Sequence, residues 1–293
     1  MRAHGAVLLD SATADATLDA ARAAAERAAR SAGVRIATPT EVADLDPAAA
    51  LWRKVWSPEA EPPVSGEMLR ALTHAGNYLS CAYDGDRLAG ALLGFFGGGA
   101  HVDHLHSHIL GVEPEFEGRG VAFALKLHQR AWALQRGIER ISWTYDPLVR
   151  RNGHFNLVKL GCRGVEYLVD FYGVMPDAIN GGDPTDRILV EWDVAAGERA
   201  AVPDDVDAWL ARGAEVVLDA DAAGLPQRRD VSGAGALLCA TPSDIVALRR
   251  SDAAAARDWR HALRDVVCAA FGNGMRLRTM ARGGWYVLAR DGD

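Results

Sequence analysis

The spacing of hydrophobic positions changes several times along the chain, and each spacing predicts a different element. Residues 11 to 33 are rich in alanine with interspersed charges, and Gly33 follows as a stop signal, which predicts one helix with a weakly apolar face. Such a face fits a helix packed onto the domain as an addition, and equally a frayed arm or a helix that binds a partner. A short strand is expected from Val34 to Ala37.

The pattern then predicts two helices and a hairpin. Apolar residues between Leu45 and Trp56 indicate a helical region, which the proline-rich stretch 58–63 ends as a loop, and a second short helix follows through Leu69. The β-rich runs 78–83 and 88–96 flank an Asp-Gly-Asp turn, so we expect them to pair as a hairpin.

A strand, a helix and a second strand come next. The segment 101–112 reads as a strand and leads into a turn that contains glycine. Apolar residues at spacings of three and four, from Phe123 to Leu134, predict a long helix that Gly137 ends. The strand 138–145 should then run parallel to the first, as in a βαβ unit.

The rest of the chain divides at a change of composition. A short helix over 152–160 and a strand over 188–194 precede residues 195–235, which contain few large apolar residues and are interpreted as a boundary. Beyond it we expect a strand at 236–240, a long helix through Trp259, and two closing strands. We find no clear internal repeat.

Composition favours small-molecule chemistry in a reducing compartment. The chain has 293 residues and a formal charge of -7, so no overall basic excess indicates a nucleic-acid partner. Its four scattered cysteines suggest neither a zinc knuckle nor a disulfide framework. No stretch approaches the ~20 apolar residues that span a bilayer. We therefore expect a cytoplasmic protein with no nucleic-acid or membrane partner.

Gly118 and Gly120 lie in the turn between the strand and the long helix. Glycines there tolerate positive φ and let an anion approach the backbone N–H groups, with the positive end of the helix dipole behind them. A plain strand-to-helix turn is the competing interpretation.

The residues around this turn carry a resemblance. The run Val112-Glu113-Pro114-Glu115-Phe116-Glu117-Gly118-Arg119-Gly120-Val121-Ala122 resembles motif A of the GNAT (Gcn5-related N-acetyltransferase) superfamily, with its motif positions at Glu117, Gly120 and Ala122. The resemblance implies that the turn binds the pyrophosphate of acetyl-CoA and that the preceding strand pairs with the pantetheine arm. The cofactor-binding residues that it implies are Leu110, Gly111, Val112, Gly118, Arg119, Gly120, Val121, Ala122, Asn152 and Asn156. Glu117 departs from the usual Gln or Arg.

The resemblance also implies a fold and a domain plan. It extends from Arg35 to Val194 and includes the later helix 152–161, and a narrower likeness is to a bacterial group of predicted acetyltransferases. We expect an α/β fold with a GNAT-like mixed central sheet flanked by helices, splayed at the motif A strand. The expected divisions are an N-terminal helical arm at 1–34, a GNAT acyltransferase domain at 35–195, and a C-terminal α+β extension at 196–293.

Three histidines on one strand suggest a proton acceptor. His104, His106 and His108 alternate with Leu105, Ser107 and Ile109, so they should share one face. A neutral imidazole can accept the proton that an attacking amine loses. The pair His106 and His108 resembles two histidines of arylalkylamine N-acetyltransferases. Structural histidines are the competing interpretation, and a metal site with His101 and Asp103 is a further one, disfavoured by the ~7 Å between same-face neighbours.

The general acid is harder to place, because Leu157 stands where many relatives have a tyrosine. Tyr172 is our candidate, with Asn156, Tyr167 and solvent as alternatives. We expect transfer of an acetyl or other acyl group from CoA to an amine of a small molecule, with no metal, by a chain that could be a homodimer. A non-catalytic acyl-CoA sensor and an O-acyltransferase remain as alternatives.

Overall fold

The computed structural model describes residues 11–56, 61–98, 102–173, 175, 182–197, 202–230 and 233–290. These residues form two compact units. Unit 1 contains the described residues up to Ile141 together with Asp193–Ala196, and unit 2 contains Ser142–Trp192 and the described residues from Gly197 on. His101 and part of the loop expected at 58–63 lie outside the described residues.

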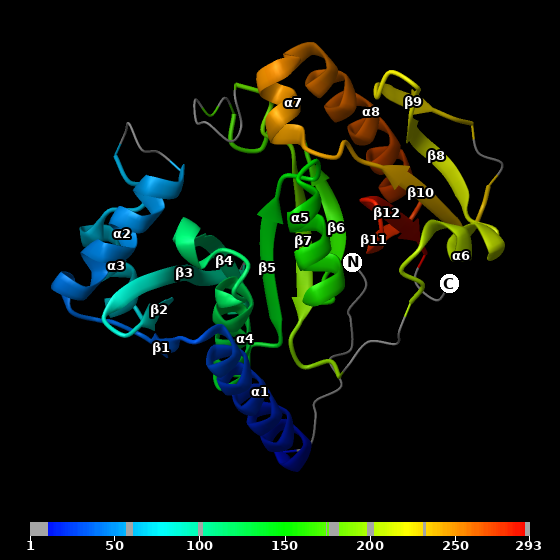
Figure 1. The fold of residues 1–293 in the computed structure, drawn as a ribbon. Coiled ribbons are helices and arrows are strands. Elements are labelled where there is room, and N and C mark those ends of the chain that lie inside the picture. Colours follow the sequence, from blue (N-terminus) through cyan, green and yellow to red (C-terminus); the bar gives the residue numbers. More distant parts are fainter. Residues whose placement is uncertain are drawn as a thin grey trace. The chain divides into compact units, whose positions relative to one another are not determined.

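Unit 1 follows the predicted order of elements closely (Figure 1). Its elements are α1 (Ser11–Ala32), β1 (Arg35–Ala37), α2 (Val42–Trp56), α3 (Gly66–His74), β2 (Tyr78–Asp84), β3 (Arg87–Gly98), β4 (Val102–Val112), the 3₁₀ turn η1 (Pro114–Phe116) and α4 (Val121–Leu134). The strands pair in the order β1, β2, β3, β4, each antiparallel to the next. The expected hairpin is confirmed as β2 and β3.

Helices cover both faces of this sheet. On one face, buried residues of α2 and α3, among them Trp52 and Leu69, pack against Leu79 and Leu93 of the strands. On the other face α4 lies so close that a Cβ built on Gly90 of β3 would meet Val121 at 3.0 Å. The sheet is therefore the middle layer of three. A ligand can reach β4 only where the helices do not cover it.

The alanine-rich helix α1 packs along α4 (Figure 1). Its buried positions are the small residues Ala21, Ala25 and Ala32, which let the two backbones approach. The helix is thus a packed part of unit 1, which decides between the interpretations that its weak apolar face left open.

Unit 2 is built around a second group of strands. Its elements are β5 (Arg140–Tyr145), α5 (Arg150–Gly153), the π-helical turn η2 (His154–Lys159), β6 (Arg163–Leu168), β7 (Arg187–Asp193), α6 (Val206–Ala211), β8 (Glu215–Ala220), β9 (Pro226–Arg228), β10 (Ala236–Ala240), α7 (Ile245–Ser251), α8 (Ala253–Gly272), β11 (Arg276–Ala281) and β12 (Trp285–Ala289). The strand order is β5, β7, β6, β11, β12, β10, β8, β9. Strand β8 runs parallel to β10, whereas the pairs β7–β6, β6–β11, β11–β12, β12–β10 and β8–β9 are antiparallel. Both units thus combine helices with strands, and the parallel pair in unit 2 makes the sheet mixed.

Unit 2 departs from the sequence expectation between 195 and 235. This segment contains α6, β8 and β9, although its composition suggested only a boundary. Trp209 of α6 packs against Leu238 and Val287, so one large side chain anchors a stretch of small and polar residues. The strand β6 was likewise not anticipated.

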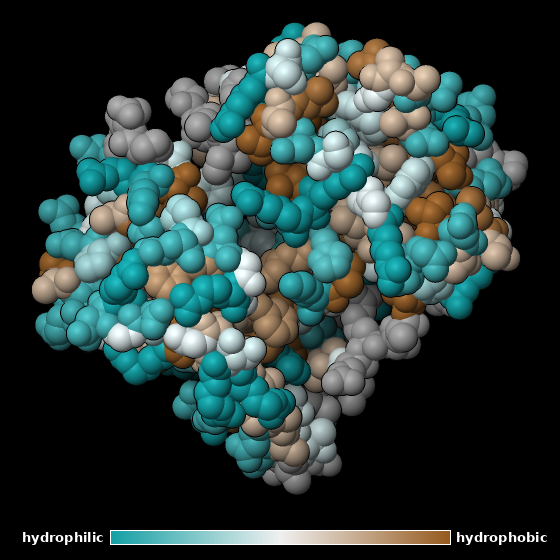
Figure 2. All heavy atoms as spheres, viewed as in Figure 1, coloured by the Kyte–Doolittle hydropathy of each residue, from teal (hydrophilic) through white to brown (hydrophobic). Residues whose placement is uncertain are grey.

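The surface facing the viewer in Figure 2 is mostly hydrophilic, with hydrophobic residues in small separate groups. Among the described helices, none has the length and apolar character needed to cross a membrane.

Candidate functional site

The glycine turn that follows β4 adopts the backbone conformation that its sequence requires. Gly118 has φ +78° and Gly120 has φ +91°, both in the left-handed region where a Cβ is strained. Gly120 is the N-cap of α4 and supplies no side chain to cap the helix. A residue other than glycine would strain the turn at both places.

The turn leaves backbone donors at the start of α4. The first intrahelical bond runs from the N–H of Ala124 to the carbonyl of Gly120, at 3.0 Å. The N–H groups of residues 121–123 therefore precede the bonded ladder, as the first N–H groups of any α-helix do, and the helix dipole adds partial positive charge there. This arrangement suits an anionic group such as a diphosphate.

The side chain of Arg119 braces the turn. Both terminal nitrogens lie 3.3 Å from Asp84 Oδ2, one donates to the carbonyl of Ala32 at 3.5 Å, and the guanidinium lies 4.7 Å from the ring centre of Phe116. Arg119 thereby joins the turn to the end of α1 and to the β2–β3 hairpin. Glu117, the departure from the motif, is exposed.

The end of β4 is fixed from the β3 side. Leu110, Gly111 and Val112 pair with β3 in regular antiparallel register. Gly111 is required by a close neighbour, because a Cβ there would lie 2.7 Å from Cδ1 of the buried Trp52. A glycine in this strand therefore marks where α2 packs directly on the backbone.

A β-bulge interrupts β4 at His108. The register passes from the pair Leu93 and Ile109 to the pair Gly94 and Ser107, so β4 has one residue more than β3 at this point. The strict alternation expected from the sequence is therefore wrong here. Ile109 packs with the α2 core, whereas Ser107 accepts a hydrogen bond from Lys126 of α4 on the opposite face.

His106 and His108 nevertheless lie together. Their ring centres are 6.0 Å apart, and each lies near the ring of Phe95, at 5.0 Å and 5.4 Å. His104 is engaged elsewhere: it forms an ion pair with Asp103, and its ring covers Gly97. The bulge thus leaves two imidazoles, not three, as a candidate pair.

The environment of the pair keeps both rings neutral. Burial, with a smaller contribution from the nearby His108, His104 and Lys126, lowers the pKa of His106 to about 4. Partial desolvation also lowers the pKa of His108, although its side chain stays accessible. At neutral pH both imidazoles can accept a proton.

Lys126 is a neighbour of the histidine pair that the sequence patterns did not single out. Its side chain is 3% exposed, and Nζ donates to Ser107 Oγ at 2.8 Å. The signal was a lysine on the apolar stripe of α4, which was interpreted only through its hydrophobic members. Gln129, one turn further along the helix, is fully buried as well.

The remaining candidates lie in unit 2. The hydroxyl of Tyr172 is 3.3 Å from Thr144 Oγ1 on β5, and the ring is 43% exposed. Asn156 is buried and its Oδ1 accepts from the indole of Trp143 at 3.2 Å, whereas Asn152 on α5 is half-buried. Leu157, the position of the family tyrosine, is buried in the core.

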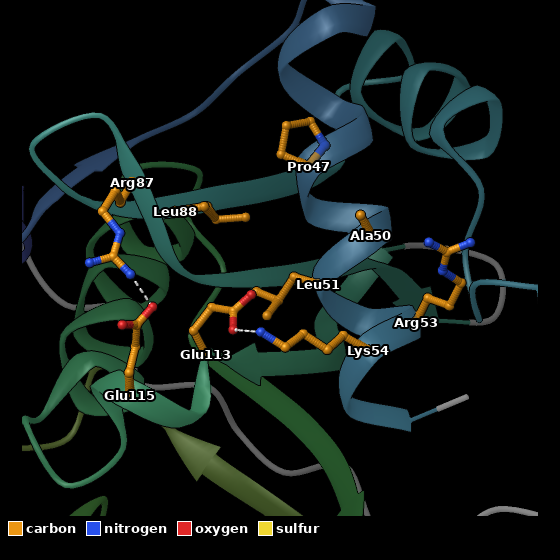
Figure 3. A pocket seen from close by; sticks show the side chains of 9 residues that line it. All are labelled: Pro47, Ala50, Leu51, Arg53, Lys54, Arg87, Leu88, Glu113 and Glu115. Carbon is orange, nitrogen blue, oxygen red and sulfur yellow. Dashed lines mark hydrogen bonds and ion pairs between the residues drawn. The ribbon is translucent and has the colours of Figure 1, made fainter. Parts of the chain in front are cut away.

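A cavity of about 700 Å³ opens beside the end of β4 (Figure 3). Lys54 pairs with Glu113 and Arg87 pairs with Glu115 across it, while Arg53 points away. These ion pairs balance the charges of the walls. No group of three or more His, Cys, Asp or Glu side chains within the described ranges is arranged to hold a metal ion.

The comparisons with known proteins point to one domain family. Residues 16–147 match the acetyltransferase (GNAT) domain. No protein of curated function matches the sequence. The ribosomal-protein-S18-alanine N-acetyltransferase from Escherichia coli is similar in structure, with 15% identity, a TM-score of 0.45, and coverage of 58% of this chain and 99% of that one. The aminoglycoside 6'-N-acetyltransferase from Enterococcus faecium has 17% identity, a TM-score of 0.43, and coverage of 57% and 99%. With TM-scores this low, these likenesses add nothing to what the domain match shows.

Proposed function

We propose that the chain is a GNAT-type acyltransferase that transfers an acetyl group from CoA to an amine of a small molecule, because residues 16–147 match the acetyltransferase (GNAT) domain. The observation that carries this proposal is the glycine turn. Two glycines with positive φ present the free N–H groups at the start of α4, and the matched domain includes this turn.

The residues that would hold the donor follow from this geometry. The amides of Gly118, Gly120, Val121 and Ala122 would bind the diphosphate, while the N–H of Arg119 already donates to the carbonyl of Phe116 at 3.3 Å. The end of β4 at 110–112 would align the pantetheine arm. The side chain of Arg119 would contribute indirectly, since it already braces the turn through Asp84. When bound, the thioester supplies an activated acyl group.

The histidine pair would supply the base. An attacking amine must lose a proton, and His106 and His108 are neutral at pH 7 because burial lowers the pKa values of both, and nearby positive groups add to this at His106. His106 is the better-defined candidate, since it is half-buried and lies against Phe95.

Tyr172 would return a proton to the leaving thiolate, supported by its exposed hydroxyl beside Thr144. Asn152 would contact the donor from α5. Asn156 would act through its bond to Trp143 rather than by direct contact, because its side chain is buried. We keep a small-molecule acceptor and a cytoplasmic location within this proposal.

Calorimetry and a thiol-release assay test the proposal together. We expect acetyl-CoA to bind with a stoichiometry of one and thiol release to depend on an added amine. A panel that pairs each amine with the alcohol of the same carbon skeleton separates N-acyl from O-acyl transfer. Absence of acetyl-CoA binding would overturn the assignment of the turn.

A non-catalytic acyl-CoA sensor is the second candidate, favoured by the buried Leu157 in place of the tyrosine and by Glu117 in the motif. Binding without turnover on any acceptor in the panel would select it.

A further inference from the structure

Two segments of unit 2 repeat one order of elements (Figure 1). The first contains β5, the helical turns α5 and η2, and the hairpin β6–β7. The second contains β10, the helices α7 and α8, and the hairpin β11–β12. In the sheet, β7 lies between β5 and β6, and β12 lies between β10 and β11. In both segments the last strand of the chain order is therefore the central strand of the three.

The two hairpins also agree residue by residue. The pairs in β6–β7 are Arg163 with Glu191, Gly164 with Val190, Glu166 with Leu189, Tyr167 with Ile188, and Leu168 with Arg187. The pairs in β11–β12 are Arg276 with Ala289, Leu277 with Leu288, Thr279 with Val287, Met280 with Tyr286, and Ala281 with Trp285. Each hairpin has one irregularity, after its second pair, which leaves out Val165 in one and Arg278 in the other. A shared bulge is a specific feature, because bulges depend on local backbone geometry.

The connections into the hairpins correspond as well. Gly161 (φ +69°) and Gly274 (φ +80°) follow the helical segments, each succeeded by a buried apolar residue and then by the arginine that opens the strand. At the other end, a proline stands two residues after β5 and two residues after β10, and the helix N-cap comes two residues later in both.

The two segments meet at a symmetric seam. Strand β6 pairs antiparallel with β11 through Gly164 and Leu277, and these two residues occupy equivalent places in their hairpins. A residue that pairs with its own counterpart lies on a local twofold axis, as in an isologous interface between identical subunits.

The contacts across the seam are reciprocal. Arg150, from the first helix of one segment, donates through Nε to Thr241 Oγ1 at 3.0 Å. Arg249, from the first helix of the other, donates to Asp146 Oδ2 at 2.6 Å. Thr241 and Asp146 are equivalent, since each directly follows the first strand and precedes the proline. Each segment therefore donates a hydrogen bond to the residue that follows the first strand of the other segment.

We propose that residues 236–289 are a second copy of the strand–helix–hairpin unit at 142–192, and that this copy serves the first as a built-in partner subunit. It occupies the β6 edge that a second molecule would otherwise pair with. The copies differ where chemistry is expected: residues 169–186 join β6 to β7 and include Tyr172, whereas only three residues join β11 to β12. The second copy supports the first and carries no site of its own. This inference does not depend on the proposed function.

The residues on the axis make the proposal testable. A Cβ on Gly164 would lie 2.8 Å from Cβ of Leu277, so the two copies fit because one has glycine where the other has leucine. We expect Gly164→Leu to clash and Leu277→Gly to leave a void, each lowering the melting temperature by at least 5 °C. If the sites are equivalent, the exchange variant carrying both substitutions recovers at least half of the larger loss.

A matched control uses a glycine and a leucine that touch without being equivalent. Gly94 and Leu105 of unit 1 are such a pair, with 3.4 Å from a Cβ on Gly94 to Leu105 Cγ and 3.0 Å to Gln129 Nε2 and to the carbonyl oxygen of His106. Exchange of these two should recover nothing. No recovery by the Gly164 and Leu277 exchange, or equal recovery by the control, would overturn the equivalence. Sedimentation of the full chain tests the partner role: we expect a monomer, and a dimer that Gly164→Leu dissociates would refute it.

Discussion

At the scale of single residues, the lowered pKa of His106 predicts how kcat depends on pH. Burial lowers its pKa to about 4, so it stays neutral at pH values where an ordinary histidine of pKa ~6.5 would be half protonated. A base works only when neutral, so activity should fall as pH drops through the folded pKa. With an acceptor that does not titrate in this range, we expect kcat to be level from pH 8 to 5 and to fall near pH 4. An acid limb near pH 6.5 would exclude His106 as the base.

Substitution tests the two histidines as the base. His106→Ala or His108→Ala should lower kcat by on the order of 10²-fold, as expected for loss of a general base, while acetyl-CoA affinity stays nearly constant. Phe95→Leu is the control, because it removes the ring against which both imidazoles pack but leaves both bases. Unchanged rates in both histidine variants would place the base elsewhere.

Lys126 offers a more selective test of the same environment. Its ammonium is one of the positive groups that lower the pKa of His106. Lys126→Met keeps an unbranched side chain in the buried space and removes the charge, so the imidazolium of His106 forms more readily. The acid limb of kcat should therefore move to higher pH. Arg136→Met, at an exposed position two residues beyond the end of α4, should leave the limb in place.

At the scale of elements, substitutions at the two ends of α4 distinguish an effect on backbone strain from an effect on ligand binding. Gly118 (φ +78°) precedes the helix and Gly137 (φ +69°) follows it, and a Cβ on either would meet no atom within 4 Å. Substitution by alanine should cost about 1 kcal/mol of stability at each place, because only the positive φ opposes it. Gly118→Ala alone should also weaken acetyl-CoA binding, measured by calorimetry. Equal affinities in the two variants would remove the turn from the site.

Sequence patterns predicted the elements of unit 1 well, because each has its own local signal. The hairpin has its Asp-Gly turn and α4 its apolar stripe with Gly137, and the structure confirms both. The bulge at His108 had no such signal, since an extra residue in a strand depends on the register with β3. Whether Tyr172, Asn152 and the amides of the turn form one site stays a prediction.

The repeat in unit 2 escaped the sequence for a related reason. Equivalent residues are not at a constant separation: Pro147 and Pro242 are closer in the chain than Gly164 and Leu277, because α7 and α8 are longer than α5 and η2. Few side chains agree between the copies, whereas the pairing register and the bulge do. The repeat is therefore visible in the backbone pairing and not in the identities of the side chains.

At the scale of the whole molecule, a buried ionic network holds α7 and α8 to the segments that follow β5 and precede β7. Arg260 is 1% exposed and bonds Asp183 at 2.7 Å and Asp146 at 3.2 Å, and Arg249 bonds the same two carboxylates. Burial raises the pKa of Asp146, but the two arginines outweigh it, so the net shift is downward. The carboxylate is therefore charged and paired at neutral pH.

Removal of this one charge should destabilise unit 2 strongly. Asp146→Asn leaves two buried guanidiniums short of a counter-charge, and breaking a buried pair in this way costs about 3–5 kcal/mol. The exposed pair of Arg282 and Asp204, at 2.6 Å, is the control, and Asp204→Asn should cost at most about 1 kcal/mol. Urea unfolding at pH 7 measures both.

The same carboxylate predicts a pH dependence of stability. Because the folded pKa of Asp146 is depressed, its contribution to the free energy of unfolding is present above the unfolded pKa and is lost as pH falls through the folded one. The stability difference between wild type and Asp146→Asn should therefore shrink steadily as the pH is lowered, and a difference that does not change with pH would mean that the lost stability is packing and not charge.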